Sequence, residues 1–253
     1  MFIIEVPFFN LDQIYNSKQV PRWLRLKENK YIVINKDKAI AVEQKRQRLV
    51  FKCSEEEFYS TWFDYFDLRT DYQEINSEIK RANKKFKIPC VRGQGIHILN
   101  QDKFEMYVYC KLVQKLGWEK AREMMIRIAT TYGIHHKNSM GDAGKVNWYE
   151  WPQPERVLEC LDKENPSTPV KKFLQKLCHA IVHDGFDITE TNDELFRVLG
   201  MHENIFPSFD MEETIRKNFG CSPEEFANDY LEDTEALAYM CILHHIKNPP
   251  KRG

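Results

Sequence analysis

The stretch Leu49-Val50-Phe51-Lys52-Cys53-Ser54-Glu55-Glu56-Glu57 decides the fold, because a strand pattern ends here and a helix pattern begins. Three apolar segments rich in strand-forming residues, 2–6, 31–35 and 39–42, precede a fourth at 49–53. Lys36-Asp37-Lys38 lies between two of them and predicts a tight turn, while residues 23–26 alternate in polarity as a further strand would. Residues 1 to 53 therefore predict a small antiparallel sheet.

From Ser54 onward the apolar residues recur with a helical period. Ser54-Glu55-Glu56-Glu57 has the capping-box pattern, in which Ser begins a helix and Glu follows three residues later. Helices are predicted at residues 71–83, 102–117, 118–132, 156–161, 170–182, 192–199, 211–219 and 222–246, and loops at 84–94 and 133–147. The predicted fold class is α+β, with a β-rich lobe at residues 1–90 and an all-helical lobe at residues 91–253.

Composition excludes several classes of protein. The hydrophobic content of 42% and the aromatic content of 13% argue against disorder, and no apolar run is long enough to span a membrane. The first residues lack a basic, apolar signal segment, so we expect a cytoplasmic protein of a bacterial or phage-infected cell. The seven cysteines occur singly, and His179 and His183 have no third ligand nearby, so neither a metal nor a cofactor is predicted.

The charge is divided unequally along the chain. Residues 1–150 carry 26 Lys and Arg against 19 Asp and Glu, whereas residues 151–253 carry 11 against 19. The segment 80–87 holds five cations around Phe86, and Lys84, Lys85 and Lys87 are candidate phosphate contacts. A solvated helix end is the alternative interpretation of this run. A basic front half indicates a nucleic-acid partner.

Three motifs in order resemble the 8-oxoguanine DNA glycosylases. Residues 9–11 and 19–23, Phe-Asn-Leu and Gln-Val-Pro-Arg-Trp, are similar to the opening of that family, and residues 62–72 to its W-x-D-Y-F helix. Residues 95–105, Gly-Ile-His-Ile-Leu-Asn-Gln-Asp-Lys-Phe-Glu, look like its G-[IL]-R-[IL]-L-x-Q-[DP]-x-[FW]-E segment. The resemblance implies a helix-hairpin-helix glycosylase architecture that binds duplex DNA and holds one extruded nucleotide.

The resemblance also assigns candidate site residues. It implies a base pocket at Lys18, Gln19 and Trp23, although core packing is the alternative for Trp23 and for its neighbour Arg22. It implies DNA contacts at Arg22, Gln114, Lys115 and His202, and a catalytic Asp210 that stabilises the sugar cation or activates the attacking group. Asp210 also fits a helix N-cap with Glu213, which is compatible with either role.

Departures from the family pattern limit the chemistry. Lys18 replaces the family glycine that lies against the damaged purine, and residues 113–116 replace S-A-N-N, whose Asn fills the gap left by the extruded base. The best match to the hairpin, residues 199–204, retains one glycine and lacks the Schiff-base lysine. We therefore expect an enzyme without lyase activity.

Two functions remain open from the sequence. The first is base handling, either by monofunctional excision or by group transfer onto a modified base, as in phage DNA hypermodification. The second is a catalytically inactive protein with this fold that binds DNA or a protein partner, for example a phage inhibitor of a nucleic-acid-dependent defence system.

Overall fold

The N-terminal lobe is built on a five-stranded antiparallel sheet. The computed structural model of the chain describes residues 1–82, 84, 87–141, 144–164, 166–191, 196, 240 and 241. The strand order is β1-β5-β4-β3-β2, and the bounds are β1 (Phe2–Glu5), β2 (Leu24–Lys27), β3 (Lys30–Asn35), β4 (Lys38–Lys45) and β5 (Arg48–Phe51). The predicted sheet is confirmed, and the turn after β3 contains Lys36 at φ 53°.

Strand β3 is buried over almost its whole length because both faces of the sheet are covered. Tyr31 and Val33 point into a core shared with Trp62 and Phe66. Ile32 packs into a second cluster on the opposite face. This alternation is the period of two that a strand imposes on its side chains.

The Ser54 capping box forms as predicted. The Ser54 hydroxyl oxygen accepts a hydrogen bond from the Glu57 backbone N–H at 3.1 Å. Helix α2 (Glu55–Glu57) continues through the π-helical segment η1 (Phe58–Trp62) into α3 (Phe63–Tyr65). The Phe58 and Trp62 side chains of this run are fully buried against the sheet, as is α1 (Leu11–Asn16) through Leu11.

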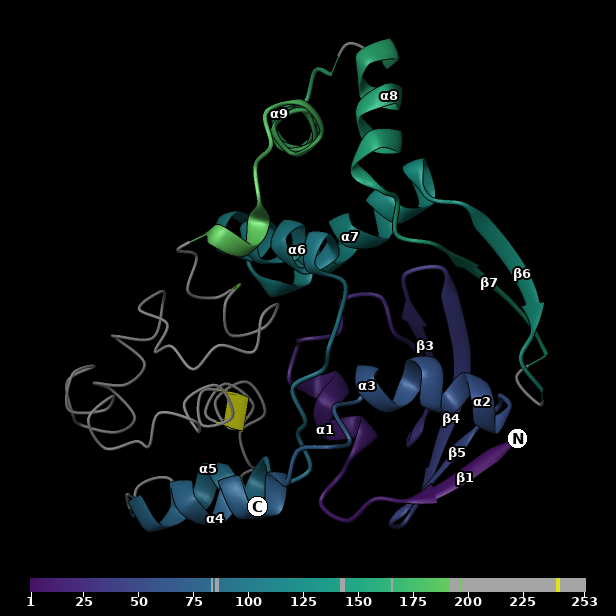
Figure 1. Cartoon of the computed structure of the whole chain (residues 1–253), viewed down its shortest axis with the longest axis vertical. Helices are drawn as coiled ribbons and strands as arrows, with labels where there is room; N and C mark the ends of the chain where they lie inside the picture. The colour runs from purple at the N-terminus through teal and green to yellow at the C-terminus, as the bar shows by residue number, and fades with distance from the viewer. Residues whose placement is uncertain are drawn as a thin grey trace.

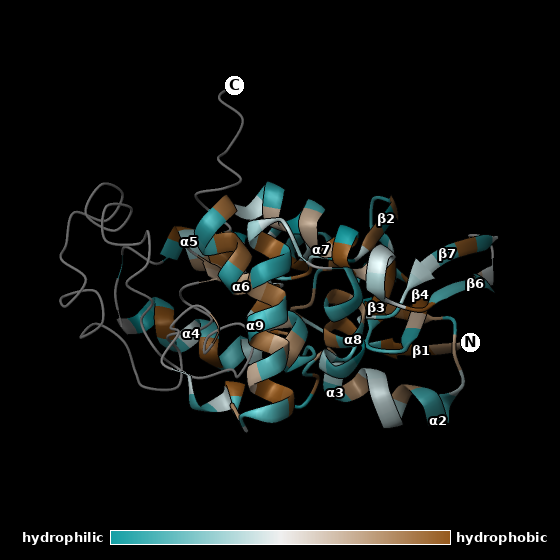
Figure 2. Cartoon of the chain, turned by 90° about the horizontal axis from the view of Figure 1, so that it is seen from above, coloured by the Kyte–Doolittle hydropathy of each residue, from teal (hydrophilic) through white to brown (hydrophobic). Residues whose placement is uncertain are grey.

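The helical lobe packs around one central helix, α6 (Lys103–Leu116) (Figure 1). Its N-cap Asp102 accepts a hydrogen bond from the Glu105 N–H at 2.8 Å, and Gly117 at φ 75° separates it from α7 (Trp118–Tyr132). The remaining elements are α4 (Tyr72–Ala82), α5 (Lys87–Arg92), α8 (Pro154–Glu164), α9 (Pro169–His183) and the 3-10 turn η4 (Ile188–Glu190). Hydrophilic and hydrophobic residues alternate along α6, α7 and α9 in Figure 2, as expected of helices with one buried face.

Side chains of α4 and α5, Tyr72, Ile79 and Cys90, pack in the helical core rather than against the sheet. The two helices thus pack with the second lobe, although the sequence analysis placed them within its first lobe of residues 1–90. None of the helices within the described ranges has the length and apolarity that a membrane crossing requires.

Two loop predictions are wrong. Residues 133–147 do not form a loop, because they contribute most of the hairpin β6 (His135–Ser139) and β7 (Lys145–Tyr149), which lies beside the sheet lobe (Figure 1). Its glycines at 141 and 144 have positive φ in the turn. Trp148 packs on the face of the sheet that carries Ile32, so this tertiary contact decides the conformation of the hairpin. Residues 87–92 form α5 despite Pro89, which lies in the first helical turn where its missing N–H costs nothing.

Candidate nucleic-acid interface

Lys18 occupies the position where the family pattern has glycine, and it retains a glycine-like backbone. Its φ is 71°, in the left-handed region that glycine adopts most easily. The Lys18 carbonyl oxygen accepts a hydrogen bond from the Tyr109 hydroxyl at 2.8 Å, and its Nζ lies 2.9 Å from the Glu119 carboxylate. The Lys18 side chain is 31% exposed, so this position reaches the surface beside α7.

Gln19, the second predicted base-pocket residue, is buried and its amide is fully engaged. The Gln19 Nε2 donates to the Ser17 hydroxyl at 3.0 Å and to the His97 carbonyl at 2.9 Å. Its Oε1 accepts the Leu99 N–H at 2.9 Å. Gln19 therefore joins the chain after α1 to the segment before α6, and has no group turned outward for a base.

Trp23, the third predicted base-pocket residue, belongs to the core of the sheet lobe. It is 1% exposed, and its indole N–H donates to the Tyr65 hydroxyl at 2.9 Å. Its ring lies against Tyr31 and Phe66, with centroids 5.7 and 6.0 Å away. The alternative interpretation, core packing, describes this placement.

Arg22, which the resemblance implies as a DNA contact, is buried as well. Its Nε and Nη2 donate to the two Glu105 carboxylate oxygens at 2.6 and 2.7 Å, and its Nη1 donates to the Tyr149 carbonyl at 2.7 Å. Its guanidinium also lies 5.6 Å from the Trp151 ring centroid. Through these contacts Arg22, whose side chain is 4% exposed, joins the sheet lobe to α6 and to the hairpin.

The Glu105 carboxylate has a raised pKa, because burial disfavours its charge more than Arg22 favours it. The geometry is nevertheless that of a bidentate, charge-assisted pair, which holds the carboxylate ionised in contact with the guanidinium.

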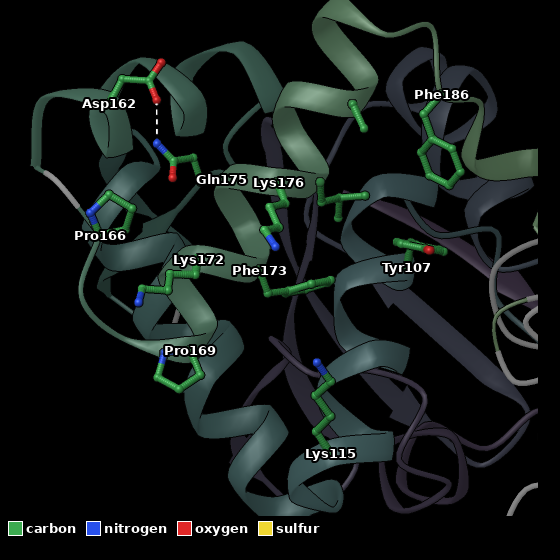
Figure 3. A pocket seen from close by; sticks show the side chains of 12 residues that line it. Tyr107, Lys115, Asp162, Pro166, Pro169, Lys172, Phe173, Gln175, Lys176 and Phe186 are labelled. Carbon is green, nitrogen blue, oxygen red and sulfur yellow. Dashed lines mark hydrogen bonds between the residues drawn. The ribbon is translucent and has the colours of Figure 1, made fainter.

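Lys115 and Gln114 lie in the last turn of α6 and are exposed. The Lys115 Nζ lies 5.4 Å from the centroid of the Phe173 ring, across a pocket between α6 and α9 (Figure 3). The pocket has a volume of about 920 Å³ and is lined by Tyr107, Lys115, Asp162, Pro166, Pro169, Lys172, Phe173, Gln175, Lys176, Leu177, Ala180 and Phe186.

The sequence of the sheet lobe and of the start of α6 has a counterpart among known families. Residues 1–107 match the family of the 8-oxoguanine DNA glycosylase, N-terminal domain. These residues are therefore similar to the N-terminal domain of the 8-oxoguanine DNA glycosylases. No curated protein matches its sequence.

Solved structures extend the likeness over both lobes. The 8-oxoguanine glycosylase/lyase of Clostridium acetobutylicum, in complex with double-stranded DNA containing cytosine opposite 8-oxoguanine, is 20% identical with a TM-score of 0.81. That comparison covers 97% of each chain. Its apo-form is 20% identical with a TM-score of 0.80, covering 96% of this chain and 95% of that one. MBOgg1 in complex with a low-affinity DNA ligand is 19% identical with a TM-score of 0.79, covering 96% of this chain and 95% of that one. At these identities the likeness establishes the fold.

The other predicted DNA contacts lie on the surface or outside the described residues. Lys84 and Lys87 are exposed beside α4 and α5. Lys85, His202 and Asp210 lie outside the described residues, as does the hairpin match at 199–204. Their roles stay predictions.

Metal ligands do not gather anywhere in the part of the chain that the structure describes. His179 and His183 are neighbours on α9 with ring centroids 4.9 Å apart, and the His179 Nδ1 lies 3.2 Å from an Asp184 carboxylate oxygen. This exposed pairing is that of solvated histidines.

The lysines and the aromatic side chain of α9 were missed by sequence reasoning. Lys172 and Lys176 are four residues apart, and Phe173 and Lys176 are three apart, so each pair is adjacent on the helix surface. This spacing can be read from the sequence, whereas the sequence analysis considered only His179 and His183 of this helix.

Proposed function

We propose that this protein binds duplex DNA and handles an extruded modified base without a Schiff-base lysine. The observation that carries the proposal is the match of fold over both lobes to a glycosylase/lyase in complex with double-stranded DNA, together with the family match at residues 1–107. The excess of basic side chains in residues 1–150 supports attraction to phosphates.

The base in question differs from 8-oxoguanine. In the family pattern the position of Lys18 is a glycine whose backbone lies close to the damaged purine. Here the carbonyl already accepts the Tyr109 hydroxyl, and a four-carbon side chain with an ammonium group stands where glycine has only hydrogen. The Lys18–Glu119 pair offers a cation and a carboxylate to a base of another shape.

Two reactions fit this proposal. In excision, water adds to C1′ of the sugar as the bond to the base breaks, and Asp210 stabilises the positive charge on the sugar. In group transfer, the base stays attached and its nucleophilic atom bonds to a group from a separate activated donor, whose leaving group departs with the bonding electrons as the base loses a proton. Both require a carboxylate near the extruded nucleotide, and neither requires a lysine nucleophile.

A second candidate is a catalytically inactive DNA-binding or protein-binding protein with the same fold, as in a phage inhibitor of a nucleic-acid-dependent defence system. The Tyr109–Lys18 hydrogen bond favours it, because it leaves the Lys18 carbonyl oxygen one lone pair fewer for a bound base. The two candidates predict different products.

The test is mass spectrometry after incubation with duplexes that contain 8-oxoguanine, uracil, hydroxymethyluracil or undamaged bases. Release of a base, an abasic site or an added mass supports base handling, and Asp210→Asn should then abolish it. Asp184→Asn serves as the control, because Asp184 is exposed and contacts only the end of α9. Tight DNA binding with unchanged DNA would instead identify the inactive candidate, and absence of binding to any duplex would overturn the proposal.

A further inference from the structure

The pocket between α6 and α9 is lined by cations and aromatic rings from both helices. Tyr107, Lys111 and Lys115 follow one another at intervals of four residues along α6, and Lys172 and Lys176 do so along α9. Residues four apart share one helix face, so each helix presents a basic face with an aromatic ring in it. The Lys111 Nζ lies 5.3 Å from the Tyr107 ring centroid.

The positive charge of the pocket has little to balance it. Asp162 is the one carboxylate among the lining residues, and its Oδ1 accepts a hydrogen bond from the Gln175 amide at 2.7 Å. Among the described residues, no carboxylate pairs with Lys115, Lys172 or Lys176. Neighbouring like charges destabilise a helix, so this arrangement is typical of a site for an anion.

The aromatic rings define what accompanies the anion. In Figure 3, Lys115 and Lys176 point toward the Phe173 ring, while Lys172 points toward Pro166 and Pro169. Phe186 is 37% exposed and approaches the buried Tyr107 with ring centroids 6.2 Å apart. Flat rings beside ammonium groups suit a ligand that joins a planar base to a phosphate.

We propose that the α6–α9 pocket binds one nucleotide unit, with its base against Phe173 and its phosphate held by Lys115, Lys172 and Lys176. This site rests on the proposed function, because the nucleotide unit would be part of a strand of bound DNA. A free nucleotide has the same base and phosphate, and is the other candidate ligand of the pocket. The site is distinct from the base position at Lys18, since that lysine contacts Tyr109, two residues from Tyr107 and thus on nearly the opposite face of α6.

The first experiment measures binding by fluorescence anisotropy at several salt concentrations. The probes are a duplex with one unpaired thymidine and the same duplex fully paired. Lys172→Gln/Lys176→Gln should weaken binding to the unpaired probe about tenfold and reduce the slope of log K against log salt by about 0.9, the value for one phosphate contact. Lys27→Gln/Lys45→Gln is the matched control, because it removes two charges that both lie beside Glu43 on the sheet.

Phe173→Leu keeps an apolar side chain but removes the stacking surface. It should weaken binding to the unpaired probe about fivefold or more and leave binding to the paired probe unchanged. In addition, 5-iodouracil at the unpaired position should cross-link on irradiation to the α9 peptide that contains Phe173. Far-ultraviolet circular dichroism verifies that each variant is folded.

The outcomes separate the site from the function. Failure of the parent protein to bind either duplex would refute the proposed function and, with it, the strand source. Three results together would overturn the pocket alone. The pocket and control variants would bind DNA with the same salt dependence, the cross-links would lie outside α9, and dTMP binding would not depend on the pocket lysines. Calorimetric binding of dTMP that the pocket variant loses supports the site with a free nucleotide as source, while loss on the unpaired probe without dTMP binding supports the strand.

Discussion

The Arg22–Glu105 pair should be the most costly polar contact to break in the described part of the chain. Both side chains are almost fully buried, at 4% and 7% exposure, and two hydrogen bonds of 2.6 and 2.7 Å join them. Glu105→Gln keeps the shape of the side chain but leaves the guanidinium charge without a carboxylate. Removing one partner of a buried pair costs about 3–5 kcal/mol.

This free energy is measurable in thermal and urea unfolding. For a chain of this size, about 2–4 °C of melting temperature corresponds to each kcal/mol, so Glu105→Gln should lower the melting temperature by about 6–20 °C. Urea unfolding followed by circular dichroism gives the free energy of unfolding directly. Glu159→Gln, which breaks the exposed Glu159–Lys163 pair of α8, should leave both measurements unchanged.

A double-mutant cycle completes the test. Arg22→Met/Glu105→Leu replaces the pair by apolar side chains, so it removes both charges and should cost less than the sum of the two single changes. A coupling of at least about 2 kcal/mol is expected for this contact. Additive single effects, or a loss below about 1 kcal/mol for Glu105→Gln, would show that Arg22 is not held by Glu105, and would return it to the candidate DNA contacts.

Three further predictions concern His97, Lys18 and Gly95. Burial lowers the pKa of His97 to about 4, so the folded state favours the neutral ring and its stability should fall as the pH drops below about 6.5. Between pH 7.5 and pH 5.5, the free energy of unfolding in urea should fall by about 1 kcal/mol more for the parent than for His97→Gln. Lys18→Gly should change the free energy of unfolding by no more than about 1 kcal/mol, because glycine suits φ 71°, and it should tighten binding to an 8-oxoguanine duplex in anisotropy titrations. Gly95→Ala should destabilise the chain by about 2 kcal/mol in the same urea assay, because its Cβ would lie 2.5 Å from the Asn10 Cβ; an unchanged midpoint would contradict the packing of this loop against α1.

The sheet and most helix positions could be predicted from the sequence because their signals are local. The apolar segments at residues 2–6 and 31–35 and the Ser54 capping box each specify structure within a few residues. The β6–β7 hairpin was missed because its conformation depends on Trp148 packing against the sheet, about a hundred residues earlier in the chain. No window of sequence at 133–147 contains that contact.

The site residues were harder to predict because a motif does not say whether its residues are buried. Gln19, Arg22 and Trp23 lie in one opening segment that resembles the family motif, and were assigned to DNA or base contact. All three side chains are turned into the protein. The α9 lysines could have been found by their spacing alone, yet their meaning depends on α6 lying opposite, which only the fold provides.

The placement of these residues explains how the fold persists at about 20% sequence identity. The motifs that carry the resemblance supply the internal framework: Gln19 joins two segments, Arg22 joins the lobes through Glu105, and Trp23 fills the sheet core. Such contacts constrain architecture and place no demand on the identity of the substrate. Lys18 is different, because it lies on this framework with a partly exposed side chain, where substitution should have little structural cost. A chain about 20% identical to its structural neighbours can therefore retain their fold.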